Sequence, residues 1–377
     1  MKPSVQPVTT PHDVRRFIDV PWHIAALTAA PQWAPPLRQT VRDALDVRRN
    51  PFYRTASIAL WIAERDGRPV GRIAAIENAA HNEFHGDTTG FFGFFECADD
   101  PEAATALVDA AADWLGERGL TSIQGPMSPS TNYETGLLVD GFEHPAVFMT
   151  PWNPPYYATL LEQAGMSKAK DLLAYQLTFG AAGLQLPDKF AKVADRVRAD
   201  QRVTFRDIDL NHFERELATC WDIYNAAWER NWGYAPMTRD EFAHMAGELR
   251  LLVLPQFAFV AHVGDNPAAF ILVVPDYNVV LRRIVNGRLF PTGAFRLLMA
   301  RNRLRSGRVM ALGVKREYRS TGLSALLMHE VIRRANAYGV TVAEASWILE
   351  DNALMNRPLV AMGAKEYRRW RIYEKAT

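Results

Sequence analysis

The 377-residue sequence has little of several features that would fix a compartment or a partner. It contains two cysteines, Cys97 and Cys220, which are too few for a disulfide scaffold or a cysteine-based zinc site, so a reducing compartment is expected. The 43 Lys and Arg nearly balance the 42 Asp and Glu, and the formal net charge is +1. No overall positive field is therefore present to hold DNA or another polyanion. We expect a cytoplasmic protein that does not bind nucleic acid.

Long apolar runs are also missing. No run approaches the ~18 apolar residues of a membrane span, and the opening MKPSVQPVTT has no apolar core of a signal peptide. Trp22, Trp33 and the aromatic run Phe91–Phe95 leave open a peripheral contact with the inner face of a membrane. Burial in a core is nevertheless the usual position of such side chains.

The composition is that of a folded protein, with 48% hydrophobic and 23% charged residues. The length predicts two domains. A run of small residues at Gly180–Gly183 is suited to a linker. We therefore predict one domain over residues 1–180 and a second over residues 184–377.

The two halves share a pattern. Residues 58–78 have two apolar runs on either side of the turn dipeptide Asp66-Gly67, and residues 257–274 repeat this figure around Gly264-Asp265-Asn266-Pro267. Later landmarks keep the same offsets of 96 and 10 positions in both halves: Pro69, Gly165 and Tyr175, then Pro267, Gly363 and Tyr373. A constant offset favours a duplicated unit.

Helical and extended patterns alternate in each half. Apolar residues recur at helical spacing over 107–115 and again over 323–332. Short apolar strands are expected at 309–314 and 342–348. Strands that alternate with amphipathic helices predict the α/β class.

The segment most informative about chemistry joins a strand that ends near Val314 to a helix that starts after Gly322. Backbone N–H groups at such a helix start, with the positive end of the helix dipole, can hold a pyrophosphate. Gly322 permits close approach of the backbone to a ligand, and Arg319 can add positive charge. A plain strand-to-helix turn is the competing interpretation.

This segment resembles the acyl-CoA signature R/Q-x-x-G-x-G/A of the GNAT (N-acetyltransferase) superfamily, with Arg319-x-x-Gly322-x-Ser324 in place of the pattern. Serine departs from the last position but is small. The resemblance implies two tandem GNAT-like domains, each with a mixed, mostly antiparallel sheet flanked by helices. It also implies that Leu312, Gly313 and Val314 bind the pantetheine arm of acyl-CoA, and that the pyrophosphate is held by Arg319, Ser320, Thr321, Gly322, Leu323 and Ser324.

Two further positions follow from the same resemblance. Asn352 corresponds to an asparagine that lines the cofactor cleft. Many GNAT proteins carry a tyrosine on the next helix as general acid, but Met355, Asn356 and Pro358 occupy that turn here.

The first half looks like a GNAT domain that has lost its cofactor loop. Residues 97–102, Cys-Ala-Asp-Asp-Pro-Glu, lead into its helix, and acidic residues at a helix start repel a pyrophosphate. We predict no CoA there. An amine must lose a proton before it attacks a thioester, so a Glu or His with a tuned pKa is needed. Glu96 is the first candidate for catalysis, followed by His85 and by Tyr133 in the loop 125–134.

A metal site is the alternative role for part of this set. His81 and His85, with Glu83 between them, could be ligands. Two histidines at loop spacing without a clear third ligand favour no metal. We therefore predict acyl-CoA as cosubstrate and no metal.

The whole-chain pattern resembles a narrower group of double-GNAT proteins that includes the bacterial ceramide synthases. Runs that carry this resemblance include Gly90–Glu96, Asn153–Tyr157 and Tyr224–Gly233. Asn153 is also predicted to cap the helix that follows it, with proline in the first turn. The resemblance implies transfer of a fatty acyl chain to the amine of a long-chain base. Two alternatives stay open: an acetyltransferase acting on a small amine or a protein, and a non-catalytic acyl-CoA-binding protein.

Overall fold

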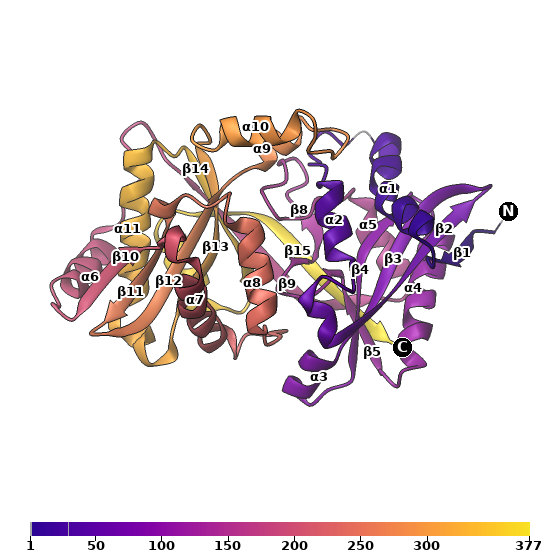
Figure 1. Ribbon diagram of the computed structural model, residues 1–377, viewed down its shortest axis with the longest axis horizontal. Coiled ribbons are helices and arrows are strands. Elements are labelled where there is room, and N and C mark those ends of the chain that lie inside the picture. Colours follow the sequence, from indigo (N-terminus) through magenta and orange to yellow (C-terminus); the bar gives the residue numbers. More distant parts are fainter. Residues whose placement is uncertain (1, 29) are drawn as a thin grey trace. The chain divides into compact units, whose positions relative to one another are not determined.

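A computed structural model of the chain describes residues 2–28 and 30–377 (Figure 1). The chain divides into two compact units. The first comprises residues 1–172, 280–294 and 368–377, and the second comprises residues 173–279 and 295–367. The residue ranges of the two units therefore differ from the predicted ranges 1–180 and 184–377, because residues 280–294 and 368–377 belong to the first unit.

The sheet of the first unit is mixed and mostly antiparallel. Its strands lie in the order β1-β2-β3-β4-β5-β15, and only the β4–β5 pair is parallel. The strands are β1 (Ser4–Pro7), β2 (Ala56–Arg65), β3 (Arg68–Asn78), β4 (Thr89–Cys97), β5 (Ser122–Gly125) and β15 (Lys365–Ala376), with β8 (Leu137–Asp140) pairing beside β15. The predicted hairpin is present, since Asp66 and Gly67 both have positive φ in the turn between β2 and β3.

Strand β15 explains why the end of the chain belongs to the first unit. Its residues Tyr373–Ala376 pair antiparallel with Ser122–Gly125 of β5. Strand β9 (Ser167–Thr178) likewise begins in the first unit and ends in the second. A boundary drawn from linker composition misses both strands, because strand pairing joins residues that are far apart in sequence.

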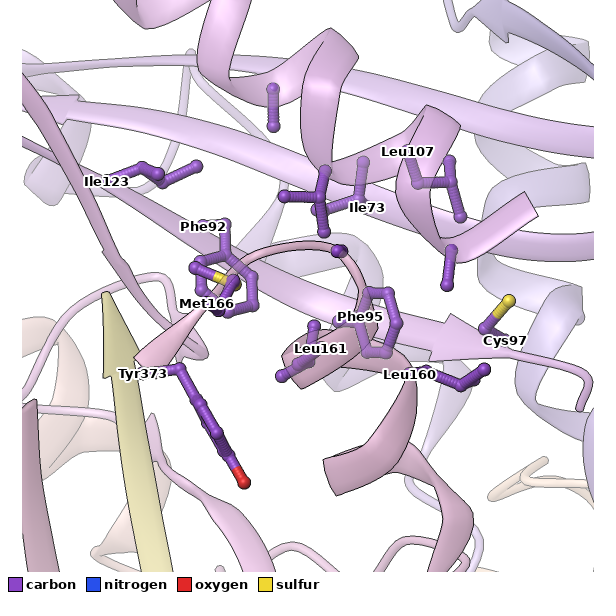
Figure 2. Close-up of a cluster of buried hydrophobic side chains, with 14 of the residues drawn as sticks. Ile73, Phe92, Phe95, Cys97, Leu107, Ile123, Leu160, Leu161, Met166 and Tyr373 are labelled. Atoms are coloured by element: carbon purple, nitrogen blue, oxygen red, sulfur yellow. The ribbon is translucent and has the colours of Figure 1, made fainter. Parts of the chain in front are cut away.

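Helices cover the first sheet. They are α1 (Pro11–Thr28), α2 (Arg38–Ala44), α3 (Ala79–His85), α4 (Pro101–Gly116) and α5 (Tyr156–Gln163); β6 (Met127–Ser128) and β7 (Glu134–Thr135) form a separate two-stranded ribbon. Helix α4 buries Leu107, Val108, Ala111 and Leu115, as the helical spacing predicts. Figure 2 shows Leu107 with the other apolar side chains of this core.

Most of the aromatic run in β4 lies in the core. Phe91, Phe92 and Phe95 are buried, and Figure 2 shows Phe92 and Phe95 among the clustered side chains. Trp22 and Trp33 are half-buried and contact each other edge to face, with ring centroids 5.6 Å apart. The buried phenylalanines are therefore core residues and do not contact lipid.

The second unit repeats this plan. Its strands lie in the order β14-β13-β12-β11-β10, and β13 and β14 are its parallel pair. They are β10 (Val203–Asp207), β11 (Ala258–Val263), β12 (Asn266–Pro275), β13 (Ser306–Val314) and β14 (Val342–Leu349). The helices are α6 (Asp188–Arg198), α7 (Phe213–Trp228), α8 (Arg239–Leu249), α10 (Gly293–Ala300, which starts in the first unit), α11 (Leu323–Tyr338) and α12 (Ala353–Ala361), after the short α9 (Asn278–Leu281).

The two faces of this second sheet are covered by different helices. Phe259, Ala261 and Ile271 pack with α6 and α11 on one face. Val260 and Phe270 pack with α7 on the other, as the two-residue period of strands requires. In the described part of the chain, no helix is both long and apolar enough to cross a membrane.

Candidate active site

The parallel strands β13 and β14 of the second unit part halfway along their length. Their pairing runs from Ser306↔Val342 to Val309↔Ala345. Both strands continue beyond it, to Val314 and Leu349. Leu312, Gly313 and Val314, the residues expected to bind pantetheine, lie in the part of β13 that pairs with β12 and has left β14. A backbone edge of β13 therefore faces the opening between the strands, and its N–H and C=O groups can bind an extended ligand.

The next element along the chain is the start of α11. A 3₁₀ turn, Arg316–Thr321, leads to Gly322, which has φ +84° and precedes the helix without a side-chain cap. The first turn contains no acidic residue. Uncapped N–H groups and the helix dipole suit an anion at this point. A Cβ on Gly322 would lie 2.8 Å from Cγ1 of Val193 in α6, so glycine is also required by packing.

Arg319 is held more firmly than the sequence suggests. Its Nη2 donates a 2.6 Å hydrogen bond to the carbonyl of Ala227, and its Nε donates to the carbonyl of Val314 at 3.3 Å. Both acceptors are neutral, so the guanidinium keeps its full positive charge. Arg319 therefore supplies a fixed charge beside the loop and ties the loop to the end of α7.

Gly313 has a neighbour that no motif predicts. A Cβ there would lie 2.5 Å from Cζ3 of Trp228 and 3.2 Å from Cε1 of Phe270. Trp228 stacks on Tyr224 with centroids 4.6 Å apart. The glycine thus permits the close approach of an aromatic side chain, whatever its backbone binds.

Asn352 acts as a helix cap. Its side chain accepts a hydrogen bond from the N–H of Met355 at the start of α12. In the same turn Asn356 donates to the carbonyls of Leu349 and Glu350. These asparagines fix the turn after β14.

An apolar cavity of about 90 Å³ lies inside the second unit. Leu312 and Val309 of β13 line it, and α11 and α12 cover it. Three of its lining side chains are methionines: Met328, Met355 and Met362. Methionine is flexible and adapts to irregular space, so the cavity can change shape. A cavity of 150 Å³ binds benzene, so this one has room for about four carbon atoms.

The corresponding helix start in the first unit is closed by acidic side chains. Asp100 caps α4 by accepting a hydrogen bond from the N–H of Ala103 at 3.1 Å. Arg65 binds Asp100 through two hydrogen bonds of 2.7 and 2.8 Å, and Glu102 at 3.1 Å. The Arg65 hydrogen bonds hold the pKa of Asp100 below its usual value. The N-terminus of α4 is therefore already occupied by carboxylates.

Glu96 lies near the end of β4 in a largely buried network. The Tyr157 hydroxyl donates a 2.7 Å hydrogen bond to its carboxylate, and Arg72 Nη2 lies 3.7 Å away. Tyr157 in turn accepts from the N–H of Cys97. Burial raises the pKa of Glu96, and Arg72 and Tyr157 oppose that rise only in part. A carboxylate with a raised pKa binds a proton more readily than an ordinary one, and the Glu96 side chain is 23% exposed, so a substrate can reach it.

The structure corrects the predicted role of Asn153 and adds Tyr157 to the surroundings of Glu96. The sequence favours Asn153 as the cap of the following helix, but the residue before α5 is Pro155. Asn153 instead accepts from the N–H of Leu138 and donates to its carbonyl. Tyr157, which the motif Asn153–Tyr157 contains, is the side chain that reaches Glu96.

His85 and Tyr133 lie elsewhere in the first unit. The exposed His85 ends α3, with its ring 4.4 Å from that of His81. Burial lowers the pKa of His81. Tyr133 contacts Phe52 edge to face at 6.0 Å. Within residues 2–28 and 30–377, no group of three His, Cys, Asp or Glu is arranged to hold a metal.

A second buried polar cluster, in the second unit, was missed at the sequence level. Arg308 donates to Ser346 Oγ at 2.9 Å, and Ser346 donates to Glu344 at 2.5 Å. Tyr367 also donates to Glu344. The cluster lies where β13 and β14 begin to part. In the sequence, only the alternation of apolar and polar residues over 342–348 points to this cluster. Such alternation predicts a strand but does not show which side chains the polar residues contact.

Comparison with known proteins identifies the family. Protein YghO of Escherichia coli (strain K12) is 36% identical over 375 residues, which cover 97% of this chain and 93% of that protein. The bacterial ceramide synthase of Caulobacter vibrioides (strain NA1000 / CB15N) is 32% identical over 380 residues, covering 99% and 97% of the two chains. No family model matches the sequence.

Solved structures agree on the fold. A tandem GNAT protein from the clavulanic acid biosynthesis pathway covers 100% of this chain and 98% of its own, with a TM-score of 0.56 and 15% identity. A GCN5-related N-acetyltransferase from Sphaerobacter thermophilus covers 99% and 95%, with a TM-score of 0.54 and 15% identity. The chain belongs to the same family as YghO and the bacterial ceramide synthase, and it has the tandem GNAT fold.

Several expectations are thereby confirmed for the tandem GNAT protein. Its fold is α/β with mixed, mostly antiparallel sheets flanked by helices, and it is an acyltransferase. The particular donor, acceptor and catalytic residues are matters for proposal.

Proposed function

We propose that this tandem GNAT protein transfers a fatty acyl chain from acyl-CoA to the amine of a long-chain base, giving a ceramide-type amide. The observation that carries the proposal is the 32% identity, over 99% of the chain, with a protein named bacterial ceramide synthase. Identity of that extent spans both units, so it is not a likeness of the fold alone.

The donor site that we propose lies in the second unit. The pantetheine arm would lie along Leu312, Gly313 and Val314, and the pyrophosphate at residues 319–324, with Asn352 beside the cleft. The parting of β13 from β14 and the uncapped start of α11 fit such a ligand. Arg319 adds a fixed positive charge.

The apolar cavity supports a donor with an alkyl chain. Leu312 belongs both to the proposed pantetheine site and to the cavity lining. The cavity has room for about four carbons as it stands, so a long chain must displace the methionines that line it. A chain that enters here would be held by apolar contact alone, which suits an alkane and no polar group.

The reaction is an aminolysis. The amine nitrogen forms a bond to the thioester carbonyl carbon, the carbon–sulfur bond breaks, and the CoA thiolate takes up a proton as it leaves. The amine also loses a proton, and we propose Glu96 as its acceptor, with Tyr157 and Arg72 holding the carboxylate. His85 and Tyr133 remain predicted contributors to the same task.

The test is mass spectrometry of the products after incubation of the purified protein with palmitoyl-CoA and either sphinganine or 3-ketosphinganine, with acetyl-CoA in parallel. We expect an N-palmitoyl product. Acetyl transfer alone would favour the acetyltransferase alternative. If no thiol is released with any of the amines, the result would favour the alternative of a non-catalytic acyl-CoA-binding protein.

A matched pair of glycine variants locates the donor site. Gly322 and Gly339 begin and end α11 with φ of +84° and +80°, so Gly322→Ala and Gly339→Ala impose similar backbone strain. A new Cβ meets Val193 only at Gly322 and has no atom closer than 3.9 Å at Gly339. We expect acyl-CoA affinity to fall in Gly322→Ala and to survive in Gly339→Ala. Equal losses of acyl-CoA affinity in both variants would show that the donor does not bind at this helix start.

A cavity variant tests the acyl group. Ala345→Phe puts a ring into the cavity from β14. We expect loss of palmitoyl transfer with retained acetyl transfer, measured as kcat/KM for the two donors. Equal effects on both donors would show that the acyl chain does not enter the cavity.

A further inference from the structure

One stretch of the chain carries a strong positive charge that the near-neutral total conceals. No acidic residue occurs between Asp276 and Glu317, and this stretch contains ten Lys and Arg. The other 33 Lys and Arg stand against all 42 Asp and Glu. The positive charge of the protein is therefore concentrated in a stretch of about forty residues that surrounds α10.

The same stretch exposes large apolar side chains. Eleven such side chains are exposed in the described part of the chain, and five of them lie between residues 285 and 299: Val285, Phe290, Phe295, Leu298 and Met299. Scattered apolar side chains on a surface are ordinary, but a concentration of them marks an interaction site.

Helix α10 presents three of these side chains on one face. Phe295, Leu298 and Met299 follow the i, i+3, i+4 spacing and are 65%, 70% and 46% exposed. Immediately before the helix, in the part of the segment that belongs to the first unit, Phe290 is 76% exposed. The helix is labelled in Figure 1.

Arginines accompany this apolar face. Arg296 on α10 and Arg303 and Arg305 just after it are exposed, and so is Arg288 before it. Two others are used inside the protein: Arg301 donates to the carbonyl of Val253, and Arg308 is buried with Glu344. The exposed arginines leave the segment both apolar and cationic at its surface.

We propose that residues 295–305 of the second unit, which comprise most of α10 and the arginines after it, dock the protein on an anionic lipid bilayer. A helix with exposed phenylalanine and leucine between arginines suits the boundary between headgroups and acyl chains: the apolar side chains enter and the guanidinium groups bind phosphate. Nucleic acid is disfavoured, because Leu298 and Met299 cannot stack on bases. The inference does not depend on the acceptor of the proposed reaction, although a lipid substrate would be delivered at such a surface.

The experiment is flotation of the purified full chain with vesicles of phosphatidylcholine alone and of equimolar phosphatidylcholine and phosphatidylglycerol. We expect binding to the anionic vesicles, weakened by salt, and little binding to the neutral ones. The double variant Phe295→Ser/Leu298→Ser should lower the partition coefficient by about a hundredfold. Arg296→Gln/Arg303→Gln should lower it by about thirtyfold.

The matched control is Leu27→Ser/Leu251→Ser, which removes two equally exposed leucines outside the segment. We expect this variant to bind vesicles like the parent protein, and all variants to melt at the parent temperature because the altered side chains are exposed. Binding that the segment variants leave intact, or no binding to anionic vesicles, would overturn the proposal. Two further outcomes would also overturn it. In either case the Phe295→Ser/Leu298→Ser variant would still bind vesicles but would lose another association of the parent protein: binding to polyuridylate, or a dimer detected by sedimentation velocity.

Discussion

The two units build the same strand-to-helix connection and finish it with opposite chemistry. In the first unit α4 starts at Asp100, whose carboxylate caps the helix and binds Arg65. In the second, α11 starts at Gly322 with no side-chain cap and no acid in its first turn. Each helix start offers N–H groups and a positive dipole end. The first is capped by its own carboxylate, and the second has no side-chain cap.

The difference teaches that the same kind of helix start can be closed by carboxylates of its own chain or left without a side-chain cap. An anion near α4 would meet the carboxylates of Asp100 and Glu102 and would have to displace Arg65 from both. The first unit retains another polar group, Glu96 with Tyr157 and Arg72. We propose that the second unit binds the donor, and we retain Glu96 of the first unit as the proposed base; the predictions below test the two proposals separately.

The largest effect should come from Glu96→Gln. It removes the proposed base while the amide keeps the shape and the contact with Tyr157, so kcat should fall by about 10²–10⁴. Glu102→Gln, an exposed glutamate of the same unit, is the control and should leave kcat unchanged. Unaltered acyl-CoA affinity in Glu96→Gln, measured by calorimetry, would support a donor site that does not include Glu96. An unchanged kcat would exclude Glu96 as base.

The pH dependence of the rate checks the same assignment. The base acts only when ionised, and burial raises the pKa of Glu96 above the ordinary 4.5. The rate should therefore fall as the pH drops through this raised pKa. The rate profile of Glu96→Gln should lack that limb. A limb that persists in Glu96→Gln would assign it to another group.

The next effect should come from Ser324→Asp, which gives α11 an acidic first turn like that of α4. Repulsion of the pyrophosphate should weaken acyl-CoA binding by about a hundredfold. An acid at a helix start favours the helix, so the melting temperature should not fall. Ser324→Asn, similar in size and uncharged, is the control, and calorimetric titration measures both. Equal affinities of Asp and Asn variants would place the pyrophosphate elsewhere.

A smaller effect, on the stability of the first unit, should come from Asp100→Ala, which removes the side-chain cap of α4. Loss of the cap and of the Arg65 contact should lower the free energy of unfolding by about 1–2 kcal/mol. The folded-state pKa of Asp100 lies below the ordinary 3.8. Its contribution is therefore present above pH 3.8 and is lost as the pH falls through the lowered pKa. Urea unfolding at neutral and acid pH should show the variant and the parent converging in acid, with acyl-CoA affinity unchanged at neutral pH.

The smallest effect should come from Arg319→Gln. The variant removes one charge beside the loop and its hydrogen bond to Ala227, so acyl-CoA affinity should fall by about fivefold to tenfold. Arg316→Gln, at an exposed position of the same 3₁₀ turn, is the control. The same titration compares them, and a larger loss for Arg316→Gln would reverse the roles of the two arginines.

Local pattern was enough for much of the architecture. The two hairpins, helices over 107–115 and 323–332 and the burial of most of the Phe91–Phe95 run all follow from turn residues and apolar spacing, which act over a few positions. The acidic start of α4 and the glycine start of α11 were predictable for the same reason. The cap at Asn153 was wrong, because its side chain bonds to Leu138, fifteen residues away.

By itself, then, the sequence determined the α/β class, the duplicated plan and the contrast between the two helix starts, since all of these depend on neighbouring residues. Only the tertiary structure decided that Tyr157 binds Glu96 across 61 positions, that Trp228 covers Gly313 and that β15 pairs with β5. It also decided that Phe290 and Phe295 lie at the surface while Phe91 and Phe92 lie in the core. Such partners are selected by packing and burial between distant segments, and no local pattern carries that information.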